Sequence, residues 1–87
     1  MARYRVLFKP SADKALRKLP VSVQKRIVAA VDGLEDNPRP PDAVKLTGER
    51  DLWRIRVGDY RVIYSIDDKR LIVLVVRIAH RKDVYRG

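Results

Sequence analysis

The sequence contains no cysteine, a single histidine and no apolar run longer than Leu71–Val76. A chain without cysteine has neither a disulfide framework nor a thiolate zinc site, and it fits a reducing cytoplasm. One histidine and scattered carboxylates form no metal-ligand cluster, so we expect neither a metal nor a cofactor. The apolar run is far too short to span a bilayer, and the first residues lack the apolar core of a signal peptide. We therefore expect a soluble, cytoplasmic protein.

Acidic side chains are scarce relative to basic ones. The 87 residues, enough for a single domain over residues 1–87, include 20 Lys and Arg against 11 Asp and Glu, a formal net charge of +9. Residues 50–87 hold ten basic and five acidic side chains, whereas residues 21–49 hold four and five. Such a localised positive charge attracts polyanions, and nucleic acid is the leading class of partner. The alternative is that basic residues only keep a small protein soluble.

Hydrophobic periodicity predicts one strand and two helices in the first half of the chain. Residues 4–8 alternate as in a strand, and Ser11 is a candidate cap for a short helix that ends before Pro20. Residues 23–34 carry an apolar stripe over three helical turns. Three prolines make residues 37–42 an extended connector.

Strand patterns then continue to residue 79. Asp67–Lys69 reads as a turn, and Leu71–Ile78 is apolar on both faces except at Arg77, which predicts a central strand covered on each side. The predicted fold is α+β: two antiparallel N-terminal helices pack on one face of a small, mostly antiparallel sheet, in the order β-α-α-β-β-β.

The most informative stretch is Leu52–Tyr64, which reads as a hairpin with Gly58-Asp59 as its loop. In that register Arg56 lies opposite Arg61, and the side-chain period of two places both on one face with Arg54. The other face then takes the apolar residues Trp53, Ile55, Val57, Tyr60, Val62 and Tyr64. Directly opposed like charges destabilise a sheet pair by up to roughly 1 kcal/mol, so we expect an anion such as phosphate on the arginine face.

The tail, Ile78–Gly87, contains the single histidine and follows the predicted central strand directly. If that strand lies beside Tyr60–Ile66, its end returns to the level of the hairpin loop. We therefore expect His80 and Arg81 to emerge near Arg61.

The hairpin Gly-Asp-Tyr-Arg-Val-Ile-Tyr and the tail Ile-Ala-His-Arg-Lys-Asp-Val-Tyr, at this separation, resemble the RelE-type toxins of the RelE/ParE superfamily. The resemblance covers nearly the whole chain, in element order as well as motifs. It implies a toxin of a toxin–antitoxin system that cuts messenger RNA in the ribosomal decoding site. Matched position by position, the family's active-site motif falls on Arg54, Arg56, Arg61, Arg81 and Tyr85.

The chain departs from the best-known members, which carry lysines where Arg54 and Arg56 stand. Because arginine stays protonated, these two side chains bind and neutralise phosphate rather than act as bases. Cleavage by the 2′-hydroxyl needs a base, stabilisation of negative charge on phosphorus and a proton for the departing 5′-oxygen. We expect Tyr85 as the base, because nearby arginines would stabilise its phenolate, with neutral His80 as the rival.

In this scheme Arg61 and Arg54 hold the phosphate, and Arg81 stabilises the transition state or donates the proton. Further basic residues are expected to contact RNA: Lys45, Arg77, Lys82 and Arg86. The basic residues of the predicted helices would contact ribosomal RNA or nothing: Lys14, Arg17, Lys18, Lys25 and Arg26.

Two other functions remain open at this point. A ParE-like inhibitor of DNA gyrase would use the same fold without cutting RNA, and a catalytically silent module would bind only RNA or an antitoxin. The resemblance also implies partners, namely a RelB-like antitoxin in a toxin–antitoxin hetero-oligomer, the ribosome and its messenger RNA.

Overall fold

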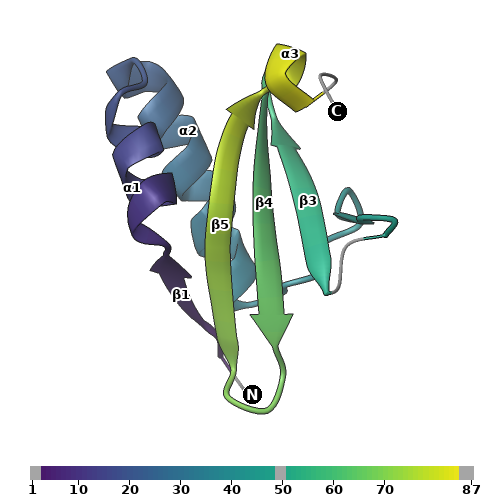
Figure 1. Ribbon diagram of the computed structural model, residues 1–87. Coiled ribbons are helices and arrows are strands. Elements are labelled where there is room, and N and C mark those ends of the chain that lie inside the picture. The colour runs from purple at the N-terminus through teal and green to yellow at the C-terminus, as the bar shows by residue number, and fades with distance from the viewer. Residues whose placement is uncertain (1–2, 49–50, 85–87) are drawn as a thin grey trace.

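The computed structural model describes residues 3–48 and 51–84, in which two helices lie side by side on one face of a twisted sheet (Figure 1). In chain order the elements are β1 (Arg5–Phe8), α1 (Pro10–Arg17), α2 (Val21–Asp32), the 3-10 helix η1 (Gly33–Glu35), β2 (Val44–Lys45), β3 (Leu52–Val57), β4 (Tyr60–Asp67), β5 (Ile72–His80) and α3 (Arg81–Val84).

The sheet has five strands in the order β1-β5-β4-β3-β2. β1 pairs with β5 in parallel, and the other neighbours are antiparallel. The predicted fold class is therefore confirmed. The periodicity missed β2, since its two residues are both exposed and show no alternation. β5 ends at His80, one residue beyond the predicted strand pattern, and Ala79 and His80 both pair with β4.

Prolines, not Ser11, mark where the helices begin. Pro10 is the first residue of α1, Lys9 is its N-cap, and no side-chain cap bond forms. The prediction of a Ser11 cap is wrong because proline suits the first helical position, where its fixed φ is preorganised and its missing N–H would have no partner. At the start of α2 a proline stands one position earlier, since Pro20 is itself the N-cap.

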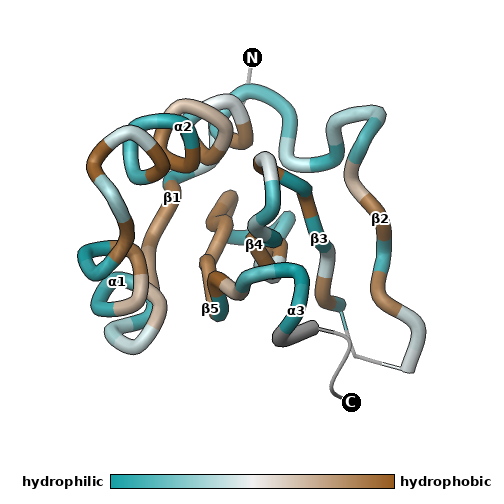
Figure 2. Tube along the Cα trace, turned by 90° about the horizontal axis from the view of Figure 1, so that it is seen from above, coloured by the Kyte–Doolittle hydropathy of each residue, from teal (hydrophilic) through white to brown (hydrophobic). Residues whose placement is uncertain are grey.

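The core lies between the helices and the inner face of the sheet (Figure 2). Tyr64, Val62, Val73 and Val75 are completely buried there. The helices contribute a second set of buried side chains: Ala12, Leu16, Ile27, Val31 and Leu34. This is the apolar side of the hairpin that the alternation predicts, so the opposite side of β3 and β4 is left for the arginines.

The outer face of β5 is less covered than its sequence indicates. Leu74 and Val76 are only half-buried, and Leu7 on neighbouring β1 is 40% exposed. The prediction that β5 is covered on both sides is therefore wrong, because α1 and α2 lie on the same side of the sheet (Figure 2).

A polar clamp joins the chain before β1, the connector and the β4–β5 turn. Arg39 donates to both carboxylate oxygens of Asp68, with N–O distances of 3.2 and 2.8 Å, and the Tyr4 hydroxyl donates to Asp68 at 2.6 Å. These bonds, first from Arg39 and then from Tyr4, lower the pKa of Asp68 to about 2. The same contact raises the pKa of the Tyr4 hydroxyl. The clamp fixes the end of the sheet opposite the Gly58 loop.

A buried tyrosine fixes the connector from inside. The Tyr64 hydroxyl donates to the Pro38 carbonyl oxygen at 2.7 Å, and both residues are buried. Burial, followed by the nearby Asp42 carboxylate, raises the pKa of Tyr64 to about 12. The predicted extended connector is thus held against the strand that carries Arg61.

Candidate functional site

The β3–β4 hairpin has the register that the sequence predicts. Val57 pairs with Tyr60, Arg56 with Arg61 and Ile55 with Val62, around the Gly58-Asp59 loop. Gly58 has a φ of +59°, a backbone conformation that glycine adopts without strain. Two guanidinium groups are consequently directly opposed on the outer face, as expected.

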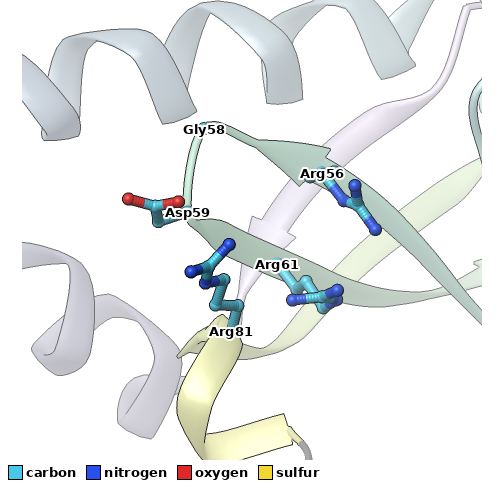
Figure 3. A pocket seen from close by; sticks show the side chains of 5 residues that line it. All are labelled: Arg56, Gly58, Asp59, Arg61 and Arg81. Carbon is cyan, nitrogen blue, oxygen red and sulfur yellow. The ribbon is translucent and has the colours of Figure 1, made fainter.

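A third guanidinium joins them from the end of β5. The backbone N–H of Arg81 donates to the Asp59 carbonyl oxygen at 2.7 Å, which places the start of α3 against the hairpin loop. Arg56, Gly58, Asp59, Arg61 and Arg81 together line a pocket of about 250 Å³ (Figure 3). Ala79 pairs with Arg61, and its small side chain leaves room beside this guanidinium.

Arg61 differs from the other arginines of the pocket in its burial. It is 2% exposed, whereas Arg56 and Arg81 are exposed. A guanidinium group carries a positive charge and five N–H donors in a fixed plane. A buried, fixed cation flanked by two accessible ones is preorganised to bind an anion that enters the pocket.

A second row of paired residues crosses β3, β4 and β5 two residues along each strand from the Arg56–Arg61 pair. Arg54 pairs with Ile63, and Ile63 pairs with Arg77, so all three share the outer face with Arg56 and Arg61. Arg54 is half-buried and Arg77 is exposed. The positive surface therefore extends from the pocket along the outer face of the sheet to Arg54 and Arg77.

His80 lies on the other side of the sheet from the pocket. It pairs with Tyr60, whose face is the apolar one, and the two rings meet edge to face at 5.2 Å between centroids. Its Nδ1 accepts a hydrogen bond from the Lys82 backbone N–H at 3.3 Å. The structure thus brings Arg81 into the pocket while His80 is not among the pocket-lining residues.

The other predicted contacts separate into three groups. Lys82 is exposed on α3, beside the pocket. Lys45 pairs with Trp53 and lines a different hollow, together with Arg39 and the β4–β5 turn, so it does not join the arginine face. Tyr85 and Arg86 lie outside the described residues.

Asp59 lines the pocket, although its sequence position predicts only a place in the hairpin loop. Figure 3 shows its carboxylate pointing away from Arg56, on the side of the loop nearer Arg81. The sequence feature that points to Asp59 as a pocket residue is its place in the loop next to several arginines. As for metals, the described part of the chain contains no group of three or more His, Cys, Asp or Glu side chains placed to hold an ion.

No helix within residues 3–48 and 51–84 has the length and apolar character needed to cross a membrane. What this arrangement offers chemically is a small basic pocket: three guanidinium groups that can bind and neutralise a phosphodiester as charge builds on it.

Comparison with known proteins gives concordant results. Residues 6–85 match the family model described as ParE toxin of type II toxin–antitoxin system, parDE. The chain is similar to Toxin RelG of Mycobacterium tuberculosis, with 36% identity over 86 residues that cover 95% of this chain and 97% of that protein.

Solved structures of toxin–antitoxin complexes are similar to this chain over most of its length. The archaeal RelE–RelB complex from Pyrococcus horikoshii matches with a TM-score of 0.81 and 38% identity, over 93% of this chain and 97% of that one. The intact RelBE toxin–antitoxin complex of Escherichia coli matches with a TM-score of 0.78 and 26% identity, over 88% of this chain and 95% of that one.

Proposed function

This chain belongs to the RelE-type toxins of the RelE/ParE superfamily, and from that membership we propose that it is a ribosome-dependent endoribonuclease that cuts messenger RNA. The observation that carries the proposal is the convergence of Arg56, Arg61 and Arg81 on one pocket. A protein that only occluded another protein's surface would have no chemical reason to bury one guanidinium between two others.

In the proposed reaction the 2′-oxygen of one nucleotide attacks the adjacent phosphorus, and the bond from phosphorus to the 5′-oxygen breaks. Arg61, already desolvated, and Arg56 neutralise the charge that accumulates on the nonbridging oxygens. Arg54 holds the phosphate from the neighbouring row of the sheet. Arg81, which lines the pocket, stabilises the departing 5′-oxygen as that oxygen takes a proton from solvent water.

The base that accepts the 2′-hydroxyl proton is proposed to be Tyr85. Guanidinium groups cannot fill this role, and the His80 ring is turned toward Tyr60, away from the arginines. A tyrosine beside several cations has a stabilised phenolate, which makes it a more effective base near neutral pH. Tyr85 follows α3 directly, and α3 begins at the pocket.

The proposed partners are a RelB-like antitoxin, with which the chain would form a hetero-oligomer, and the cytoplasmic ribosome with its messenger RNA. Support for the antitoxin comes from the similar chains, which were solved as RelE–RelB complexes. The basic outer face of β3 and β4 supports an anionic partner, and its position beside half-buried Leu74 and Val76 supports an amphipathic one.

A reconstituted translation reaction tests the nuclease proposal. Messenger ends are mapped by primer extension after the protein is added to programmed ribosomes, and we expect cuts within translated codons. Intact messages together with arrested gyrase supercoiling would instead support a ParE-like gyrase inhibitor, whose family name the matching family model carries. Intact messages with normal supercoiling would leave only a silent binding module.

Single-turnover cleavage by the Tyr85→Phe variant tests the base. We expect a loss of about 10²-fold or more, the usual contribution of a positioned base. Tyr4→Phe is the matched control, because Tyr4 binds Asp68 at the opposite end of the sheet. An unchanged rate for Tyr85→Phe would remove this tyrosine from the mechanism.

A further inference from the structure

Arg26 places its guanidinium against the loop of the candidate site. A Cβ added to Gly58 would lie 3.3 Å from Arg26 Nη1, 3.5 Å from Nη2 and 3.6 Å from Cζ. Both terminal nitrogens lie closer to this position than Cζ does, so the nitrogen-bearing end of the Arg26 side chain lies against the loop. The absence of a side chain at Gly58 is what makes this close approach possible.

The donors of Arg26 are available to a ligand. Arg26 is exposed on α2, and the ion pairs found in the described part of the chain involve Arg3, Arg17, Arg39 and Arg70 rather than Arg26. A neighbouring basic residue on the same helix is placed differently. Lys25 lines a groove on α2 with Val21 and Val28, away from the Gly58 loop.

The contact extends the positive surface around the loop tip. Gly58 lines the pocket with Arg56, Arg61 and Arg81 (Figure 3), so a guanidinium packed against Gly58 lies at the rim of that pocket. The pocket cations come from β3, β4 and the start of α3, whereas Arg26 comes from α2. An RNA strand carries phosphates in series, so a strand whose scissile phosphate occupies the pocket presents its next phosphate near the rim.

We propose that Arg26 forms a second phosphate subsite, which binds the phosphodiester adjacent to the one that is cleaved. This inference rests on the proposed nuclease function. Arg26 acts as a positioning residue: it binds substrate and transition state equally, so it lowers KM without changing kcat. Its planar fork suits bidentate contact with phosphate oxygens, which a lysine ammonium cannot reproduce.

The test compares Arg26→Gln with Lys25→Gln, since both variants remove one positive charge from adjacent exposed positions of α2. Steady-state cleavage is measured on programmed ribosomes over a series of salt concentrations. For Arg26→Gln we expect KM to rise about fivefold or more with kcat within about twofold, as for a charge at the rim of an interface. The slope of log(1/KM) against log salt should become shallower by about 0.7, the contribution of one phosphate contact on a single strand. Arg26→Lys should restore the slope but only part of KM.

The outcomes separate this inference from the function on which it rests. If the unmodified protein cuts messages and Arg26→Gln behaves as Lys25→Gln does, the second subsite is overturned while the nuclease stands. A fall in kcat with unchanged KM would also overturn it, because Arg26 would then act on the chemistry or on the loop. If the unmodified protein makes no cuts, the proposed function itself fails. Thermal unfolding of both variants verifies that the fold is retained.

Discussion

The backbone N–H of Arg81 is hydrogen-bonded to the Asp59 carbonyl oxygen at 2.7 Å, which joins the first turn of α3 to the loop between β3 and β4. This bond uses main-chain atoms only, so it is compatible with any residue at position 81 except proline. The point from which the Arg81 side chain starts is therefore fixed by the backbone of two neighbouring elements, beside the pocket that this side chain lines.

Replacing Arg81 by Gln should impair the reaction without impairing the fold. The backbone bond to Asp59 remains, and the exposed side chain contributes little to stability. We expect single-turnover cleavage to fall by about 10²-fold, the usual cost of removing one preorganised charge-stabilising group. Arg70→Gln is the control, because Arg70 is an exposed arginine in the β4–β5 turn at the far end of the sheet. Equal rates for the two variants would refute a role for Arg81.

The clamp around Asp68 predicts an acid-dependent loss of stability. Its folded pKa of about 2 lies below the unfolded value near 3.9, so the contribution of the carboxylate is fully present above the unfolded pKa and disappears as the pH falls toward 2. Asp68→Asn should thus unfold at lower urea than the unmodified protein at pH 7, and the two midpoints should approach each other as the pH falls from about 4 to about 2. Asp32→Asn, an exposed carboxylate on α2, serves as the control. A gap that persists to pH 2 would contradict the assignment.

The buried Tyr64 hydroxyl should make the protein less stable at alkaline pH, whereas the Asp68 clamp makes it less stable in acid. Its pKa is raised to about 12 by burial, whereas an unfolded tyrosine ionises near pH 10. The unfolded chain therefore releases this proton first, and the unmodified protein should lose stability from about pH 10 to 12. Tyr64→Phe leaves the buried Pro38 carbonyl without its donor and should cost about 1–3 kcal/mol at pH 7. Urea unfolding monitored by circular dichroism should show this difference shrinking above pH 10; a constant difference would contradict the raised pKa.

Local patterns predicted the hairpin better than any other part of the chain. In Leu52–Tyr64 the alternation of side chains, the turn residues and the charge distribution all require the same register, and β3 and β4 have that register. The pocket followed from it, because Arg81 comes directly after a strand that had to return beside Tyr60. A segment is predictable when its side-chain alternation, its turn residues and its charge distribution all require the same structure.

Features that depend on how distant elements pack were not predictable in this way. The approach of Arg26 to Gly58 depends on the angle at which α2 crosses the hairpin, which no spacing in the sequence encodes. The Asp68 clamp joins residues from three separate segments, and its partners are unremarkable surface residues when read singly. The side of β5 on which His80 lies was decided by the pairing register with β4, which includes an irregularity between Ile63 and Tyr64.

Substitutions of Gly58 separate two requirements at this position, a left-handed φ and space for the Arg26 guanidinium. Alanine must adopt the left-handed φ of +59° and should lose about 1–2 kcal/mol of stability for that reason. Asparagine tolerates this conformation, so Gly58→Asn should be closer to the unmodified protein in its unfolding midpoint. Both side chains, however, introduce a Cβ 3.3 Å from Arg26 Nη1, and the flexible Arg26 side chain must shift by a few tenths of an ångström. Hence Gly58→Asn should raise KM for cleavage in the same direction as Arg26→Gln but by less, while it retains most of the stability. If Gly58→Asn were stable and had an unaltered KM, the close contact between Arg26 and the loop would have no part in substrate binding.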